Sequence, residues 1–210
     1  MTDTYENGYA ESRARFERET AEHEMTILHD DGLYRHLRFQ KPGTSFYYYD
    51  LITWPGRLVV CGDCGDYMFS RLRDMFEFFE GSTINPHYWG EKLQGPRPGR
   101  DGAKSYSEDR FKVCVLEWLE DTVVDLSVDA EKALREAVQR DVLDDDDGYL
   151  ADESMARLRL HDFDHGGHYF TDTFEWDLRE WDWSYLWCCW AIVRGIQQYR
   201  AVAVTEAVAA

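Results

Sequence analysis

The sequence predicts an α+β fold, with an antiparallel β-meander near the N-terminus packed against four to six helices of the C-terminal half. Two observations lead to this prediction. Short runs of strand-forming residues separated by turn signals fill residues 32–69. Apolar residues at helical spacing dominate most of the chain that follows. One aromatic-rich stretch, residues 184–200, carries no charge before Arg194, so we expect the first half of this helix to be buried at the centre of the fold.

The predicted meander consists of about four strands. In residues 32–39, apolar Leu37 and Phe39 alternate with polar side chains, which is the period of a strand with one buried face. The next strands are expected at residues 45–53, 57–61 and 66–69. The last two flank a Gly-Asp-Cys-Gly sequence and should form a hairpin.

The helical prediction rests on apolar spacing and on capping residues. Asn85-Pro86 is typical of a helix start, with Asn as the cap and Pro at the first helical position. Asp129 is the expected cap of a later helix. The remaining predicted helices cover residues 8–27, 73–80, 111–119, 134–142 and 184–200.

A length of 210 residues predicts a single domain over residues 1–210. Residues 95–102, Gly-Pro-Arg-Pro-Gly-Arg-Asp-Gly, form the most linker-like stretch and mark the place for an internal boundary. The aromatic fraction of 15% favours a firm core over disorder.

The charge is strongly negative and uneven. The chain has 23 basic and 41 acidic residues, a formal net charge of −18, which argues against direct binding of nucleic acid or of an anionic membrane. Residues 1–105 have a net charge of −4 and residues 106–210 a net charge of −14. Such a surface either keeps the protein soluble by self-repulsion or imitates the phosphates of DNA and occupies a basic groove of a partner protein.

The densest acidic positions are the candidate partner-binding residues. They are Asp144, Asp145, Asp146, Asp147, Asp172, Glu175, Asp177, Glu180 and Asp182. Five Trp residues lie near the last of these, and exposed Trp ringed by acids would suit a protein-binding hot spot, although a packed core is the simpler interpretation.

Two further stretches contain metal-ligand residue types. His161, Asp162, Asp164, His165 and His168 lie within eight residues and could bind a divalent metal, although they match no known metal-site spacing. The pair Cys61 and Cys64 lacks a second CxxC, so a plain hairpin is favoured over a zinc knuckle. We expect no cofactor, with a divalent metal as the alternative.

No targeting or nucleotide-binding motif is present in the sequence. Residues 1–20 are polar, and the longest apolar run, residues 185–193, is far shorter than the roughly 20 residues that span a bilayer. Five cysteines without a secretion signal favour reduced thiols in a cytoplasm. There is no GxGxxG, no P-loop and no GxSxG, which disfavours an enzyme.

The chain from about residue 20 to residue 200 resembles a family of proteins encoded by bacteriophages and prophages, for which no activity is established. The resemblance is carried by residues 23–39, 53–56, 62–71, 74–76, 84–86, 88–89, 91–92, 187–192 and 195–199. It implies a small phage product that acts in the cytoplasm of a bacterial host, and it assigns no catalytic residue.

Charge and resemblance together predict a non-enzymatic protein that occupies a basic, nucleic-acid-handling surface of a host defence or nucleic-acid-processing protein, in the manner of a DNA mimic. One alternative is a metal-dependent hydrolase that uses the stretch from His161 to His168, with a metal-bound water as nucleophile. The other is an accessory factor that binds the phage's own replication or packaging proteins.

Overall fold

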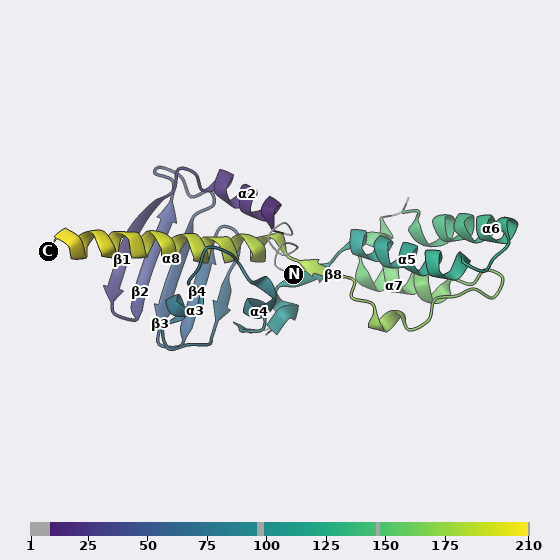
Figure 1. Cartoon of the computed structure of the whole chain (residues 1–210). Coiled ribbons are helices and arrows are strands. Elements are labelled where there is room, and N and C mark those ends of the chain that lie inside the picture. Colours follow the sequence, from purple (N-terminus) through teal and green to yellow (C-terminus); the bar gives the residue numbers. More distant parts are fainter. Residues whose placement is uncertain (1–8, 96–98, 146–147, 210) are drawn as a thin grey trace. The chain divides into compact units, whose positions relative to one another are not determined.

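The computed structural model describes residues 9–95, 99–145 and 148–209, and it has the predicted α+β fold (Figure 1). The chain divides into two compact units. The sheet unit contains the residues up to Ala103 and those from Trp181 onward, whereas the helical unit is Lys104–Glu180. The chain therefore leaves the sheet unit directly after the Gly- and Pro-rich stretch at residues 95–102.

The sheet unit is built on a six-stranded antiparallel sheet in which each strand pairs with the next along the chain, in the order β1-β2-β3-β4-β5-β6. The strands are β1 (Glu24–Asp31), β2 (Tyr34–Gln40), β3 (Tyr49–Trp54), β4 (Arg57–Gly62), β5 (Tyr67–Phe69) and β6 (Leu93–Gln94). The hairpin predicted around the Gly-Asp-Cys-Gly sequence is confirmed as β4 and β5.

The helix predicted for residues 8–27 is wrong in its second half. The helix α2 covers only Ala10–Glu19, and residues 24–31 form the edge strand β1. Most side chains of β1 are exposed, and Met25 is the one that packs against the core. An edge strand of this kind has no alternating burial and leaves little periodicity in the sequence.

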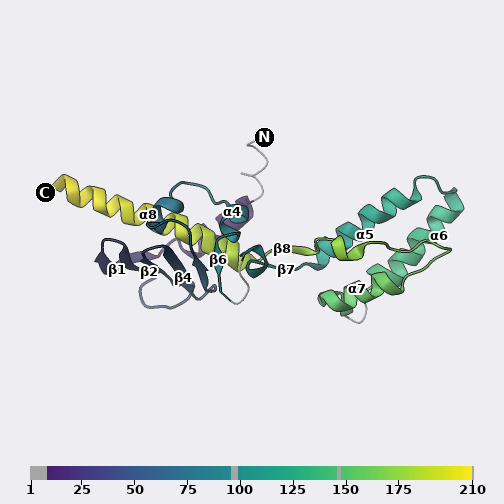
Figure 2. The ribbon, with the colours of Figure 1, turned by 90° about the horizontal axis from the view of Figure 1, so that it is seen from below.

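Helix α8 (Trp183–Ala209) lies along one face of the sheet, as Figure 2 shows. The first half of the helix is buried as predicted. Gly195 allows a close approach to the sheet, because a Cβ at this position would lie 2.5 Å from Leu51 Cδ1 and 3.0 Å from Phe39 Cζ. The absence of a side chain at Gly195 therefore sets the spacing between helix and sheet.

The aromatic side chains of α8 bury their rings and keep partners for their polar atoms. Tyr185 Oη donates to the carbonyl of Pro86 at 2.9 Å, and Trp187 Nε1 donates to Glu19 Oε2 at 2.9 Å. Trp190 Nε1 donates to Ser12 Oγ at 3.1 Å. Burial of these large rings without an unsatisfied donor stabilises the packing of α8 against α2.

A buried ion pair joins the sheet to the first short helix. Arg35 of β2 is 7% exposed and donates through both terminal nitrogens to Asp74, at 2.9 and 3.0 Å. Asp74 also caps α3 (Met75–Phe78), since its carboxylate accepts from Phe76 N. The Arg35 guanidinium lies over the Phe76 ring at 4.6 Å and near the Tyr199 ring of α8 at 5.6 Å. One side chain thereby connects β2, α3 and α8.

The second short helix of the sheet unit is α4 (Pro86–Gly90). Its predicted cap is confirmed, because Asn85 Oδ1 accepts from Tyr88 N at 3.1 Å.

The five cysteines of the chain are free thiols. At the end of β4, Gly62 has a φ of 152° and a Cβ there would lie 2.2 Å from the Tyr48 carbonyl oxygen, so the close approach of β4 to the start of β3 requires a glycine.

The helical unit contains three helices around a core of its own. These are α5 (Glu108–Val123), α6 (Val128–Val138) and α7 (Glu153–Asp162). Helix α5 buries Phe111, Val115 and Leu119, as its spacing predicted. The cap predicted for α6 is wrong: Ser127 accepts from Ala130 N, and Asp129 lies inside the first turn. Helix α7 was not predicted.

Both connections between the units run through a two-stranded sheet of β7 (Lys104–Tyr106) and β8 (Arg179–Trp181). Ser107 N donates to the Leu178 carbonyl and Asp182 N donates to the Ala103 carbonyl, both at 2.9 Å. The helical unit therefore begins and ends at residues that lie side by side in space.

Among the described residues, no helix combines the length and the apolar character needed to cross a membrane.

Candidate binding surface of the helical unit

The helical unit carries most of the charge of the protein. Residues 104–180 contain 22 acidic and 9 basic side chains, a formal net charge of −13 out of −18 for the chain. This excess of acidic side chains is carried by fewer than half of the residues of the chain. The charge that the surface of the unit presents depends on how many carboxylates the nine basic side chains neutralise.

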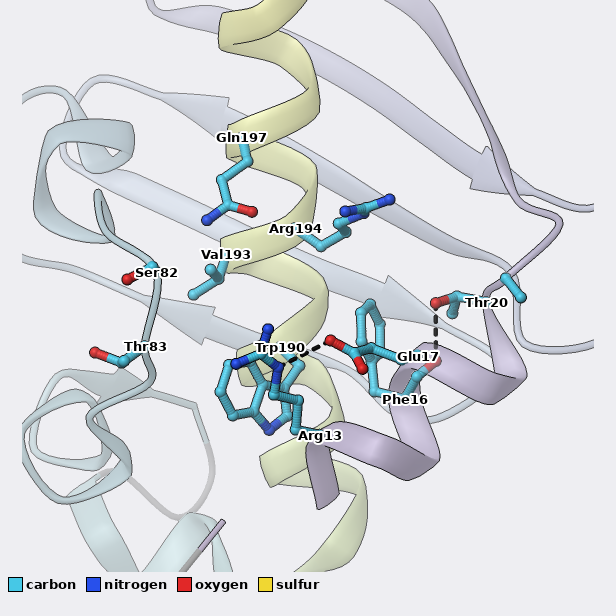
Figure 3. Close-up of a pocket in the computed structure, with 11 residues that line it drawn as sticks. Arg13, Phe16, Glu17, Thr20, Ser82, Thr83, Trp190, Val193, Arg194 and Gln197 are labelled. Carbon is cyan, nitrogen blue, oxygen red and sulfur yellow. Dashed lines mark hydrogen bonds and ion pairs between the residues drawn. The ribbon is translucent and has the colours of Figure 1, made fainter. Parts of the chain in front are cut away.

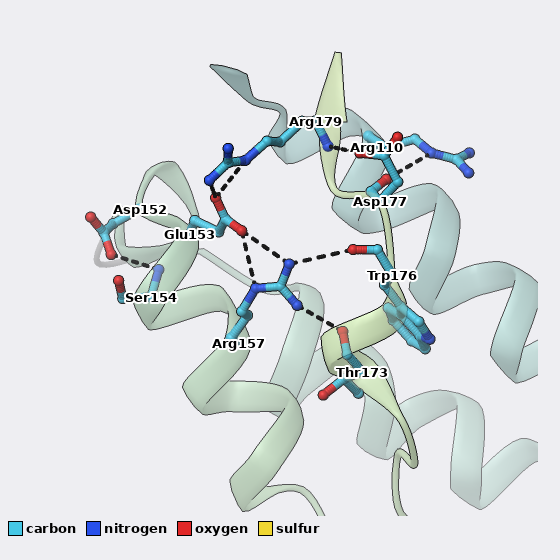
Figure 4. A network of polar contacts seen from close by, with 9 residues as sticks. All are labelled: Arg110, Asp152, Glu153, Ser154, Arg157, Thr173, Trp176, Asp177 and Arg179. Carbon is cyan, nitrogen blue, oxygen red and sulfur yellow. Dashed lines mark hydrogen bonds and ion pairs between the residues drawn. The ribbon is translucent and has the colours of Figure 1, made fainter. Parts of the chain in front are cut away.

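A polar network within the unit uses two of these arginines (Figure 4). Glu153, at the start of α7, accepts from Arg157 at 3.0 and 3.1 Å and from Arg179 at 3.1 and 3.2 Å. Arg157 also donates to the carbonyls of Thr173 and Trp176, at 2.7 and 3.4 Å. The network fastens the segment that follows α7 onto that helix.

The electrostatics of this network favour an ionised Glu153. Burial would raise the pKa of Glu153, but the hydrogen bonds and positive charges of Arg157 and Arg179 outweigh burial and lower that pKa below its ordinary value. One carboxylate thus engages two guanidinium groups, and neither arginine is left to form a basic patch.

The other basic side chains of the unit are also engaged with partners inside it. Arg110 donates to the Asp177 carbonyl at 3.4 Å. The remaining contacts are the ion pairs Lys104–Asp177, Lys112–Glu108, Lys132–Glu136, Arg135–Glu120, Arg135–Glu131, Arg140–Asp141 and Arg159–Asp145. Each of the nine basic side chains thus contacts a carboxylate or a carbonyl of the same unit, and the 22 acidic side chains of the unit outnumber them.

The acidic residues singled out in the sequence are spread over several segments of the chain. They come from three segments of the helical unit and, for Asp182, from the sheet unit, where this residue is half-buried. Asp146 and Asp147 lie outside the described residues. Asp172 and Glu175 are exposed; Asp172 precedes a short 3₁₀ turn and Glu175 is the last residue of that turn.

Several of these carboxylates have structural partners. Asp145 pairs with Arg159 and accepts from Leu150 N at 2.9 Å. The hydrogen bond from Lys104 Nζ at 2.8 Å lowers the pKa of Asp177. Glu180 accepts from Ser107 Oγ at 2.6 Å, and Asp144 accepts from Gln139 Nε2 at 2.6 Å. Of the predicted set, Asp172 and Glu175 are exposed and their carboxylates form no hydrogen bond or ion pair with a described residue.

A second set of carboxylates was missed by the reading of the sequence. Glu117, Asp121, Asp125 and Asp129 follow one another at intervals of four residues, from the last two turns of α5 to the first turn of α6. All four are exposed, and none forms an ion pair with a described residue. The interval of four places Glu117 and Asp121 on one side of α5, whereas Asp125 lies in the turn after α5 and Asp129 in the first turn of α6.

Exposed aliphatic side chains accompany these acids. Val113 and Leu116 of α5 are 42% and 45% exposed, and Val124 and Val128 at the α5–α6 turn are 76% and 81% exposed. We call the four carboxylates and these four aliphatic side chains the α5–α6 edge. A surface of this composition can combine electrostatic attraction with apolar contact.

The His- and Asp-rich stretch forms a tight turn. His165 and His168 exchange backbone hydrogen bonds at 3.0 and 3.1 Å, and Gly166 and Gly167 supply the left-handed conformations, with φ of 61° and 85°. The Asp164 carboxylate accepts from Gly167 N at 3.1 Å. His161 and Asp162 are exposed at the end of α7.

Within the described part of the chain, no group of three His, Cys, Asp or Glu side chains is arranged to hold a metal ion. In this stretch the two glycines and Asp164 build the turn itself. The pair Cys61 and Cys64 likewise belongs to the β4–β5 hairpin. The geometry therefore gives the metal-dependent hydrolase hypothesis no assembled set of ligands among these residues.

Comparison with known proteins finds no family model, no curated protein and no solved structure that matches the chain.

Proposed function

We propose that the protein is a non-enzymatic binding protein whose helical unit docks on a basic surface that a partner otherwise uses to bind nucleic acid. The observation that carries the proposal is the α5–α6 edge, in which four exposed carboxylates and four exposed aliphatic side chains fall within residues 113–129 and none of the four carboxylates forms an ion pair with a described residue. The carboxylates would take the place of nucleic-acid phosphates, and binding would release the anions that accompany the basic surface.

The proposal includes a cellular setting. The partner would be a nucleic-acid-processing or defence protein in the cytoplasm of a bacterial host, as the resemblance to phage-encoded proteins implies. The aliphatic side chains of the edge favour a protein partner, because they would be buried against an apolar strip beside the partner's basic residues.

The first test captures the partner. The full chain is immobilised, incubated with a bacterial lysate, and eluted either with duplex DNA or with increasing salt. We expect the main captured protein to be a nucleic-acid-binding protein that both treatments release, because the DNA competes for the same basic surface. A captured partner that resists both salt and DNA would overturn the proposal.

The second test assigns the binding to the edge. The variant Glu117→Gln/Asp121→Asn/Asp125→Asn/Asp129→Asn removes four charges with little change of shape. At about 0.5 kcal/mol for each solvent-exposed pair, the four together contribute roughly 2 kcal/mol, so we expect the Kd for the captured partner to rise about 30-fold.

A matched control removes four exposed carboxylates from the sheet unit instead, with Glu24→Gln/Asp31→Asn/Glu77→Gln/Glu80→Gln. The two variants have the same net charge, so a general effect of charge would weaken both equally. We expect the control to change the Kd less than twofold. An equal loss in both variants would show that the α5–α6 edge is not the contact surface.

A further inference from the structure

A groove lies over α8 in the sheet unit, on the side of the helix that is turned away from the sheet (Figure 3). Its volume is about 420 Å³, which is within the range of small-molecule sites. Figure 3 shows Ser82 and Thr83 on one side of α8, Glu17 of α2 and Thr20, which follows α2, on the other side, and Trp190 between them. The groove therefore has two polar walls and an aromatic floor.

Arg13 of α2 is held in place at this floor. Its Nε donates to Glu17 Oε1 at 2.8 Å, and its guanidinium carbon lies 5.4 Å from the centre of the Trp190 ring. Trp190 is itself anchored by its hydrogen bond to Ser12. The terminal nitrogens Nη1 and Nη2 of Arg13 have no hydrogen-bond partner among the described residues. An arginine oriented by one carboxylate, with its terminal nitrogens free, is suited to bind an oxyanion.

Arg194 of α8 supplies a second guanidinium. It is exposed, lines the groove, and forms no ion pair or hydrogen bond with the part of the chain that the structure describes. Glu17 is the one carboxylate among the lining residues, and it already binds Arg13. The groove is therefore a positive site in a chain with a net charge of −18.

The opposite wall offers groups for a hydroxylated ligand. Ser82 and Thr83 are exposed, and their hydroxyl groups can both donate and accept hydrogen bonds. Gln197 donates through Nε2 to the Gly81 carbonyl at 2.9 Å, which leaves its Oε1 as an acceptor. Neutral donors and acceptors at this wall match the hydroxyl groups of a sugar.

We propose that this groove binds a small phosphate monoester of the sugar-phosphate class. The phosphate would be held by Arg13 and Arg194, and the hydroxyl groups of the sugar by Ser82, Thr83 and Gln197. This site is separate from the α5–α6 edge, and it stands or falls independently of the proposed docking function.

The test is isothermal titration calorimetry of the full chain with ribose 5-phosphate, inorganic phosphate and ribose. We expect saturable 1:1 binding of ribose 5-phosphate, weaker binding of inorganic phosphate and none of ribose. Arg194→Gln should weaken the binding of ribose 5-phosphate at least about tenfold, the loss typical of one hydrogen bond to a charged group. Its melting temperature should stay that of the wild type, since the side chain is exposed.

A matched control and a second variant separate the two walls. Arg18→Gln removes the same charge from an exposed position of α2 that does not line the groove, and it should change the affinity less than twofold. Ser82→Ala/Thr83→Val should weaken the binding of ribose 5-phosphate and leave that of inorganic phosphate unchanged. The proposal is overturned if ribose 5-phosphate gives no saturable heat, if ribose binds equally well, or if Arg18→Gln weakens binding as much as Arg194→Gln.

Discussion

The ion pair between Arg35 and Asp74 allows a stability prediction of defined size. The Arg35 side chain is only 8% exposed. In the variant Asp74→Ala it stays buried but loses both hydrogen bonds to the Asp74 carboxylate. Its Nε already has no partner among the described residues, so the buried guanidinium keeps only its hydrogen bond with the Tyr199 side chain and has no counter-ion. Removing one partner of a buried pair costs about 3–5 kcal/mol. The Asp74 side chain is 15% exposed, which favours the lower end of this range.

The same carboxylate also caps α3, and the loss of such a cap costs about 1 kcal/mol. We therefore expect Asp74→Ala to lower the free energy of unfolding by roughly 4 kcal/mol, measured by urea denaturation followed by circular dichroism at neutral pH. Asp74→Asn keeps the shape and a capping oxygen and should lose less. The surface control Asp31→Asn, on the edge strand β1, should remain within about 0.5 kcal/mol of the wild type. A loss below about 1 kcal/mol for Asp74→Ala would refute the assignment of Arg35 as a buried cation that depends on this carboxylate.

Three further predictions concern pH, packing and thiol chemistry. Burial would raise the pKa values of Asp74 and Asp50, but their hydrogen-bonded cationic partners lower both pKa values overall. The stability that these groups contribute is present above about pH 4 and lost as the pH falls below it, so acid denaturation should be less steep in Asp74→Asn. Gly195→Ala would place a Cβ 2.5 Å from Leu51 Cδ1 and should cost about 1–3 kcal/mol in urea denaturation, whereas a loss near zero would show that α8 can shift. Burial raises the pKa of every cysteine thiol, that of Cys64 to about 12, so alkylation near pH 8 should be slow in the native protein and fast in urea. Rapid labelling of the native protein would contradict this last prediction.

The elements that could be predicted from the sequence are those whose burial follows a short, regular period. Helix α5 and the first half of α8 bury long apolar faces, and the β4–β5 hairpin is bracketed by turn residues. Each of these signals is local, so it survives without knowledge of the rest of the fold. The α+β class follows from these elements alone.

The elements that were missed have weak or interrupted periods. Strand β1 lies at the sheet edge and exposes nearly all of its side chains, and α7 fully buries only Ala156 and Leu160. An acid such as Asp129 suits both the cap and the first turn of a helix, so the sequence does not distinguish the two positions. Ser127 is the cap of α6 because the preceding turn ends there. Local composition does not determine these boundaries.

The sign of the candidate surface follows from the sequence, whereas the pairing of its carboxylates does not. Counting charges locates the acidic half of the chain, but it cannot tell which carboxylates are neutralised. Lys104 and Asp177 pair across 73 positions, and Arg179 reaches Glu153 across 26. Such pairings depend on the tertiary fold. As a result, predicted residues such as Asp145 and Asp177 form ion pairs, whereas the four carboxylates of the α5–α6 edge form none with a described residue.

The position of the helical unit in the chain has a consequence for its evolution. Ala103 and Asp182 are joined by a backbone hydrogen bond of 2.9 Å, so a short turn could replace the intervening segment and leave all six strands and α8 continuous. Equally, the excised segment could be grafted onto an exposed hairpin of an unrelated scaffold, because its own two ends lie side by side. Insertion or removal of this segment would therefore change the sheet unit only at two residues that lie side by side.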